Sequence, residues 1–198
     1  MFGGSSLQWF LSGVVVMITM FGTSMTGANL QFEIMTGAFE RMLATPLSRS
    51  SLMIGRALKE LQAAIVTLVA VPFGFALYPL HVLAGLVLLG IFGVGVGALS
   101  YELAIAARKT EWIFWVVQQS LLFPLLILSG MMLPLETGPE WMRIVSLVNP
   151  LTYIVDAERA LFAGTLGDPA VLWGIVAALV TAAVGLTVGV RSIRGATI

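Results

Sequence analysis

The chain has 198 residues, with ten Lys and Arg balanced by ten Asp and Glu, so its zero net charge gives no indication of a nucleic-acid partner. Hydrophobic residues make up 59% of the chain and charged residues 10%, and the mean hydropathy is +1.01. Soluble domains carry roughly 25% charged residues. The composition therefore indicates an integral membrane protein, and the absence of cysteine excludes disulfides and thiolate metal sites.

Long apolar segments recur along the chain. A helix needs about 20 mainly apolar residues to cross the roughly 30 Å hydrocarbon core of a bilayer. The first such segment, 7–30, has no charged residue before it, which favours a retained span over a signal peptide with its basic leader. The other predicted spans are 61–78, 82–101, 112–133 and 171–190. The expected fold is an all-α integral membrane protein with about five transmembrane helices.

The connection between the second and third spans is short. Pro79, Leu80 and His81 leave room only for a tight turn, so we expect these two spans to form an antiparallel hairpin. Pro72 within the second span predicts a kink, because its ring disrupts the helical hydrogen bonding.

A polar segment, 33–60, follows the first span and carries four basic residues. Apolar side chains fall at helical spacing along its first half, opposite Glu40 and Arg41, which predicts an amphipathic helix lying along the membrane surface. Pro46 should end that helix, because proline lacks the N–H donor that a helix interior requires.

Residues 134–169 are too polar to span a membrane and too apolar for an ordinary loop. Apolar residues over 141–148 predict one short helix. Asn149 and Pro150 form a turn that starts a second helix, which Gly164 is suited to end. We expect two short re-entrant helices that dip into the membrane face and return.

The distribution of basic residues predicts the orientation. The borders 33–60, 108–111 and 191–198 together hold eight of the ten Lys and Arg, whereas the opposite borders hold only Arg143 and Arg159. The positive-inside rule places the first set, including the C-terminus, in the cytoplasm. The N-terminus would then lie outside, although no charge precedes the first span to direct that insertion. We therefore expect that a preceding span is missing from the chain.

The sequence contains no recognisable set of catalytic or metal-binding residues. His81 is the sole histidine, and a metal site would have to rely on carboxylates. A phosphate-binding P-loop needs glycine directly before lysine, whereas Lys59 and Lys109 follow leucine and arginine. The chain is therefore not expected to be an ATPase by itself.

Glu102 is the acidic residue closest to the interior of a span. Acids inside membranes often mark ion or proton paths. Because Arg108 and Lys109 lie within two helical turns, we interpret Glu102 instead as a snorkelling or salt-bridged residue at the membrane interface. Glycines in the third span (90, 93, 95 and 97) and in the last span (185 and 189) indicate close helix packing, and either set could face a partner subunit.

Two stretches together resemble the permease subunits of type-2 ABC exporters. The first, Gly37–Glu60, has Glu-Arg before leucine and then Thr-Pro-Leu-Ser-Arg. The second, Leu128–Gly164, has Ser-Gly, Pro-x-Trp, Asn-Pro-Leu-Thr-Tyr and Asp-Ala-x-Arg in succession. The resemblance covers nearly the whole chain and fits the daunorubicin-resistance and multidrug branch better than the polysaccharide branch.

The resemblance implies a six-span half-transporter that works as a homodimer or paired permease with two separate ABC ATPase subunits. Those subunits would hold ATP and Mg, and this chain would hold no cofactor and no metal. The implied coupling helix would contact the ATPase through Gly37, Phe39, Glu40, Arg41, Met42, Leu43 and Thr45. The implied external re-entrant region would take its shape from Pro134, Trp141, Asn149, Pro150, Tyr153, Asp156 and Arg159. The family's N-terminal cytoplasmic segment and first span have no counterpart in the sequence.

The expected function is export of a hydrophobic or amphipathic substrate, such as a drug, an antibiotic or a lipid-like molecule, across the cell membrane. Two alternatives from other classes stay open. One is an ion-coupled secondary transporter that uses Glu102, and the other is a membrane scaffold without transport. Intramembrane enzyme activity is the least favoured class, because no nucleophile and base pair can be assembled.

Overall fold

The computed structural model describes residues 5–36, 65, 78–108, 110–131, 134–135 and 138–195. The predicted coupling helix, with its seven candidate ATPase contacts from Gly37 to Thr45, lies outside the described residues. The same holds for nearly all of the predicted second span, 61–78.

Every regular element in the described part of the chain is a helix. The helices are α1 (Ser5–Met35), α4 (Pro79–Ala106), α5 (Glu111–Ile127), α6 (Glu140–Ser146), α7 (Pro150–Phe162) and α8 (Pro169–Gly195). The predicted all-α fold class, with short helices ahead of the last span, is confirmed.

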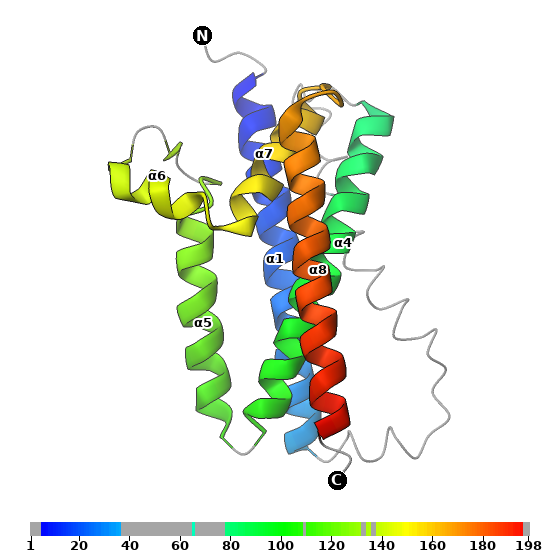
Figure 1. Ribbon diagram of the computed structural model, residues 1–198, viewed down its shortest axis with the longest axis vertical. Helices are drawn as coiled ribbons and strands as arrows, with labels where there is room; N and C mark the ends of the chain where they lie inside the picture. The colour runs from blue at the N-terminus through cyan, green and yellow to red at the C-terminus, as the bar shows by residue number, and fades with distance from the viewer. Residues whose placement is uncertain are drawn as a thin grey trace.

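Three long helices form the body of the molecule. In Figure 1, α1, α4 and α8 lie side by side and run in the same direction, starting at the end where α6 and α7 lie. We call this end the α6–α7 end. The shorter α5 runs in the opposite direction. A tight turn joins α4 to α5, and in this turn the Thr110 N–H donates to the Ala107 carbonyl at 2.9 Å. Helix α7 packs against α1, α4 and α8.

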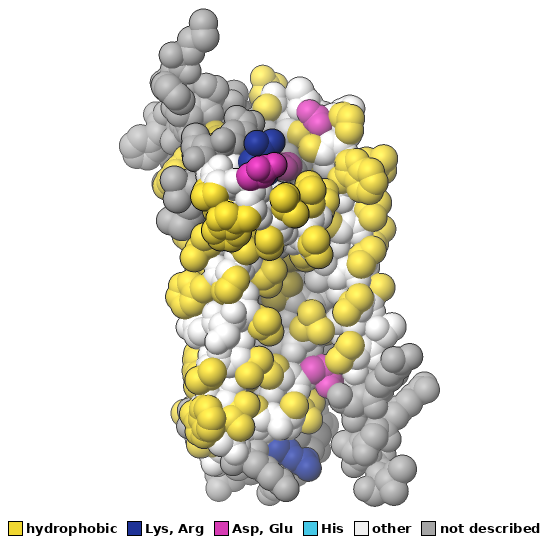
Figure 2. All heavy atoms as spheres, turned by 60° about the vertical axis from the view of Figure 1, so that its left-hand side comes forward, with side chains coloured by type: hydrophobic (Ala, Val, Ile, Leu, Met, Phe, Trp, Pro, Cys, Tyr) yellow, Lys and Arg dark blue, Asp and Glu magenta, His cyan; other side chains and the backbone are white. Residues whose placement is uncertain are grey.

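The composition of these helices is that of membrane spans. Three of them are long and apolar enough to cross a bilayer, over Trp9–Met35, Pro79–Ala106 and Pro169–Gly189, and α5 has a shorter apolar stretch, Trp112–Ile127. The space-filling view shows the visible charged side chains toward the two ends, with apolar side chains between them (Figure 2). This pattern matches a multi-pass membrane protein.

The predicted turn at residues 79–81 is wrong, because these residues form the first turn of α4. Tyr78 has extended backbone (φ −104°, ψ 97°) and Pro79 is the first helical residue. Proline suits that position, since its missing N–H would have no partner there in any case. His81 consequently lies in a helix, with its ring edge against the Tyr78 ring at 5.4 Å between centroids.

The fourth predicted span is also too long, because α5 ends at Ile127 rather than near Leu133. The Ser129 hydroxyl donates to the Leu126 carbonyl at 2.7 Å and so occupies the acceptor that another helical turn would use. Gly130 then adopts φ 73°, a left-handed conformation that ends a helix. Hydropathy alone does not detect this end, because the residues that follow remain apolar.

Glycine allows the closest helix contacts. A Cβ at Gly95 would lie 2.6 Å from the Thr181 carbonyl oxygen, and a Cβ at Gly185 would overlap the Gly95 backbone, so α4 and α8 touch through their main chains. The interpretation of these two glycines as packing positions is confirmed, and they pack within the chain. Gly90 and Gly97 differ, since no atom of the described residues lies within 4 Å of a Cβ placed there.

Candidate functional site: a capped helix end above an apolar cavity

The C-terminal end of α5 points at α7, and its last carbonyls need partners that the helix cannot supply. Asn149 Nδ2 donates to the Leu125 carbonyl at 2.8 Å. Thr152 Oγ1 donates to the Leu128 carbonyl at 3.4 Å. Side chains of α7 therefore cap the end of α5.

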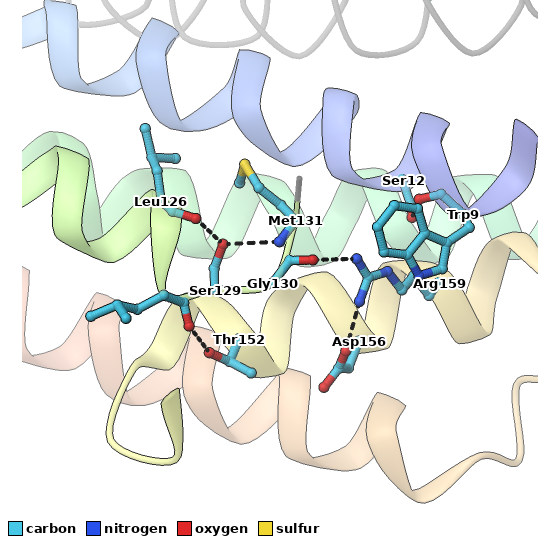
Figure 3. A network of polar contacts seen from close by, with 10 residues as sticks. Trp9, Ser12, Leu126, Ser129, Gly130, Met131, Thr152, Asp156 and Arg159 are labelled. Atoms are coloured by element: carbon cyan, nitrogen blue, oxygen red, sulfur yellow. Dashed lines mark hydrogen bonds and ion pairs between the residues drawn. The ribbon is translucent and has the colours of Figure 1, made fainter. Parts of the chain in front are cut away.

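The third cap comes from Arg159, whose NH2 group donates to the Gly130 carbonyl at 2.7 Å. Its NH1 group lies 3.3 Å from Asp156 Oδ1, and its guanidinium stacks over the Trp9 ring at 4.2 Å from the centroid. Figure 3 shows these contacts converging on Arg159 from α1, α7 and the turn after α5. One side chain thus connects three segments of the chain.

The capping residues share one face of α7. Asn149, Thr152, Asp156 and Arg159 are three or four residues apart, which is the spacing of neighbours along one side of a helix. We call these four residues the capping face. Three of them donate to carbonyls at or just after the end of α5, and the fourth, Asp156, pairs with Arg159.

Burial sets the ionisation of the charged pair. Burial raises the pKa of Asp156 above its usual 3.8, although nearby Arg159 partly opposes this shift. Burial lowers the pKa of Arg159, and Asp156 partly opposes that shift in turn. For both groups the loss of hydration outweighs the attraction between them. The pair therefore contributes geometry more than electrostatic stability.

Local chemistry fixes both ends of α7. Asn149 is the N-cap, and its Oδ1 accepts a hydrogen bond from Leu151 N–H at 3.0 Å. At the other end Gly164 has φ 82°. There Thr165 N–H donates to the Ala160 carbonyl and Gly164 N–H to the Leu161 carbonyl, each at 3.0 Å, in the Schellman arrangement.

The structure brings together some of the residues predicted for the external region and separates others. Asn149, Asp156 and Arg159 join in the capping face, and Pro150 is the first residue of α7. Tyr153 is on a different side, where its hydroxyl donates to the Leu147 carbonyl at 2.7 Å. Trp141 and Pro134 are both exposed.

The sequence reasoning missed four participants. Thr152, Ser129 and Gly130 complete the capped end, and Trp9 supplies the ring under Arg159. Thr152 could have been found from its spacing to the predicted residues on α7. Nothing local to Trp9 indicates its partner 150 residues later.

Glu102 is placed differently from its interpretation as an interfacial residue. Its side chain is buried, and its Oε1 lies 3.5 Å from where a Cβ at Gly189 of α8 would be. It forms no ion pair with any residue that the structure describes, Arg108 included. A buried carboxylate does not fit a snorkelling residue, and the alternative of a salt bridge with Lys109 stays a prediction, because Lys109 lies outside the described residues.

A cavity of about 320 Å³ lies between α1, α4 and α5 and reaches the start of α7. The space-filling view shows a hollow at about mid-height, bordered mostly by apolar side chains (Figure 2). Among the residues that the structure describes, no charged side chain lines the cavity. Its lining residues are Met20, Ser24, Phe92, Val96, Leu99, Ser100, Leu103, Val117, Gln118, Leu121, Leu122, Leu125, Pro150, Leu151 and Thr181.

Few polar groups border this cavity, and three of them form a connected set. Ser100 Oγ donates to the Ser24 carbonyl at 2.6 Å and accepts from Gly27 N–H at 3.1 Å. Gln118 Nε2 donates to the same Ser24 carbonyl at 3.2 Å. The arrangement suits an uncharged, largely apolar guest held by very few hydrogen bonds.

Comparison with known proteins agrees with this picture of a membrane bundle. The chain is 28% identical over 172 residues to the daunorubicin resistance ABC transporter permease protein DrrB1 of Streptomyces coeruleorubidus, a match that covers 81% of this chain and 59% of the relative. It is 30% identical over 163 residues to the putative transport permease ycf38 of Cyanophora paradoxa, covering 79% of this chain and 56% of the relative.

The probable multidrug ABC transporter permease YbhR of Escherichia coli K12 is 25% identical over 167 residues, covering 78% of this chain and 44% of the relative. The chain thus spans about half the length of the curated relatives it matches. No solved structure matches it.

The ABC-2 type transporter family matches residues 1–163, which is most of the chain and includes α1, α4, α5, α6 and α7. The resemblance noted from the two sequence stretches is confirmed. The chain belongs to the ABC-2 type transporter family of membrane permeases.

Proposed function

We propose that this chain is the transmembrane subunit of an ABC exporter that moves an uncharged hydrophobic or amphipathic molecule out of the cytoplasm. The observation that carries the proposal is the cavity between α1, α4 and α5, which is lined mostly by apolar side chains and reaches Pro150 and Leu151 at the start of α7. A charged guest would lose its hydration there without compensation. The names of the relatives, which refer to drug resistance, support the same class of substrate.

The energy source would be a separate ABC ATPase that holds ATP and Mg. In the proposal it docks on residues 37–45, with Glu40 and Arg41 as polar contacts, and this chain pairs with a second permease. The C-terminus then lies in the cytoplasm and α6 and α7 lie at the external surface. The distribution of basic residues supports that orientation.

The test uses inside-out membrane vesicles that contain the chain and its ABC ATPase. Daunorubicin serves as the test compound because of the relative that bears its name, and uptake is measured at a pH above the pKa of its amino group, where the molecule is uncharged. We expect uptake that requires ATP hydrolysis and that falls at least tenfold in Glu40→Ala and Arg41→Ala while the amount of inserted protein is unchanged. Arg143→Ala, on exposed α6, is the matched control and should transport normally.

A second candidate function rests on Glu102, which is buried within α4 next to α8. Buried carboxylates in membranes often take part in ion or proton movement. An ion-coupled transporter would take up substrate in response to a proton or sodium gradient without ATP, and Glu102→Gln would abolish that uptake. Gradient-driven uptake that is insensitive to ATP would replace the exporter proposal with this one.

A further inference from the structure

Gln118 of α5 is buried, with 6% of its surface exposed, and lines the cavity. Its Nε2 donates to the Ser24 carbonyl at 3.2 Å. A carbonyl oxygen can only accept, so this bond fixes which end of the amide faces Ser24. The other end, Oε1, is buried and accepts no hydrogen bond from any residue the structure describes.

An unpaired buried acceptor is unfavourable, because it has lost its hydrogen bonds to water and gained none. Three neutral side-chain acceptors in the described part of the chain are in this state: Thr19 Oγ1, Gln31 Oε1 and Gln118 Oε1. Of these residues, only Gln118 lines the cavity. Its amide oxygen is therefore the one that a guest in the cavity could satisfy.

We infer that the cavity binds a neutral, largely apolar molecule whose hydroxyl or N–H group donates a hydrogen bond to Gln118 Oε1. This inference rests on the proposed function and specifies the class of its substrate. The apolar lining disfavours charged guests, while Gln118 discriminates between guests with and without a donor. Sites with a buried polar group reject analogues that leave the group unpaired.

The test compares 2-naphthol with 2-methoxynaphthalene, in which a methyl group replaces the hydroxyl hydrogen. Binding to the full chain in phospholipid nanodiscs is measured by equilibrium dialysis, and empty nanodiscs correct for partition into lipid. We expect 2-naphthol to bind roughly two- to tenfold more tightly, which is the range for one net hydrogen bond. Equal affinities would overturn the inference.

The variant Gln118→Met removes the amide while keeping a side chain of similar length. We expect the affinity ratio of the two compounds to fall to about one in this variant. The matched control is Gln119→Met, because Gln119 is the next residue of α5 and does not line the cavity. It should retain the full ratio. If Gln118→Met does not fold, the comparison of the two compounds in the unaltered chain still decides the question.

The donor could belong to an exported compound or to a membrane lipid. Nanodiscs that contain diacylglycerol, a neutral lipid with one hydroxyl, distinguish the two sources. Competition between diacylglycerol and 2-naphthol would assign the site to lipids, and lack of competition would assign it to compounds from the aqueous side. Either result supports recognition of a donor by Gln118, provided that the preference for 2-naphthol is present.

The outcomes also separate this inference from the proposed function. Binding of both compounds with equal affinity overturns the role of Gln118 and leaves an apolar binding cavity, as an exporter requires. Binding of neither compound overturns both statements. A preference for 2-naphthol without ATP-driven export in vesicles supports the role of Gln118 and overturns the exporter proposal.

Discussion

Arg159 makes three different contacts with one guanidinium, to the Gly130 carbonyl, to Asp156 and to the Trp9 ring. Lysine keeps the charge but lacks the planar fork of donors that serves all three. We expect Arg159→Lys to lower the free energy of unfolding by about 1.5–3 kcal/mol, the usual range for a hydrogen bond to a charged group. Denaturation in mixed lipid and detergent micelles measures this loss of stability.

The control is Arg143→Lys, on the exposed surface of α6, which should change stability by less than about 0.5 kcal/mol. A similar loss in both variants would contradict the role given to Arg159.

Asp156 predicts a pH dependence of a definite sign. Its pKa is raised above 3.8 in the folded chain, so the folded state binds the proton more tightly than the unfolded state. The free energy of unfolding should therefore fall as the pH rises from below 3.8 through the raised pKa. In Asp156→Asn this contribution disappears. Because Asp156 is half exposed, stability at pH 7 should differ from that of the unaltered chain by less than about 1 kcal/mol.

The sign of this pH dependence is tested by measuring unfolding curves of the unaltered chain and of Asp156→Asn at several pH values between 3 and 7. The other carboxylates contribute equally to the two proteins, so the difference between the curves reports on Asp156. Glu140→Gln, an exposed position on α6, is the control for loss of one acid. A stability difference that grows in favour of the aspartate form with rising pH would contradict the prediction.

At the scale of the helices, the contact between α4 and α8 depends on Gly95 and Gly185. A methyl group at either position would meet main-chain atoms, which cannot rotate away as a flexible side chain could. We expect Gly95→Ala and Gly185→Ala each to lower the free energy of unfolding by about 1–3 kcal/mol, as overpacking does in protein interiors. Gly90→Ala is the matched control, because in the described part of the chain nothing lies within 4 Å of the added Cβ.

In that control the removal of a helical glycine should stabilise the protein by up to about 1 kcal/mol. The measurement is again unfolding in mixed micelles. If all three substitutions change the free energy of unfolding by the same amount, the prediction that Gly95 and Gly185 are needed for the close contact of α4 with α8 is wrong.

Much of the helical architecture could be predicted from sequence, because its signals are local. Hydropathy identifies the segments, and Asn149, Pro150 and Gly164 fix the ends of α7 through chemistry within a few residues. The end of α5 is predicted too far along the chain, because the apolar sequence continues to Leu133. The helix ends earlier because of the Ser129 hydroxyl and the φ of Gly130, which hydropathy does not register.

The candidate site could be predicted only in part. Asn149, Asp156 and Arg159 were expected to give the region its shape, but the carbonyls that accept from Asn149 and Arg159 belong to α5 and the turn after it, more than twenty residues earlier. Gln118 was not singled out at all. Helix α5 carries apolar residues around most of its circumference, so the sequence does not reveal which face of this helix borders a cavity.

At the scale of the whole molecule, the absence of cysteine allows the orientation to be tested with single introduced thiols. Val148 is 84% exposed at the α6–α7 end, whereas Arg108 lies in the turn between α4 and α5 at the opposite end. In intact cells we expect Val148→Cys to react with a membrane-impermeant maleimide and Arg108→Cys to react only after permeabilisation. The reverse pattern would place the α6–α7 end in the cytoplasm and exclude the proposed direction of export.

The capped end of α5 also has a mechanical consequence. Hydrogen bonds from α7 hold one end of this helix, and its other end is held by the short turn to α4. A helix of 17 residues is about 25 Å long, so a tilt of about ten degrees around the capped end would move the far end by about 4 Å. Such a rotation keeps the caps in place while it changes the width of the cavity beside Gln118. In such a tilt the capping face of α7 would be the fixed point, and the turn to α4 would have to move with the far end of α5.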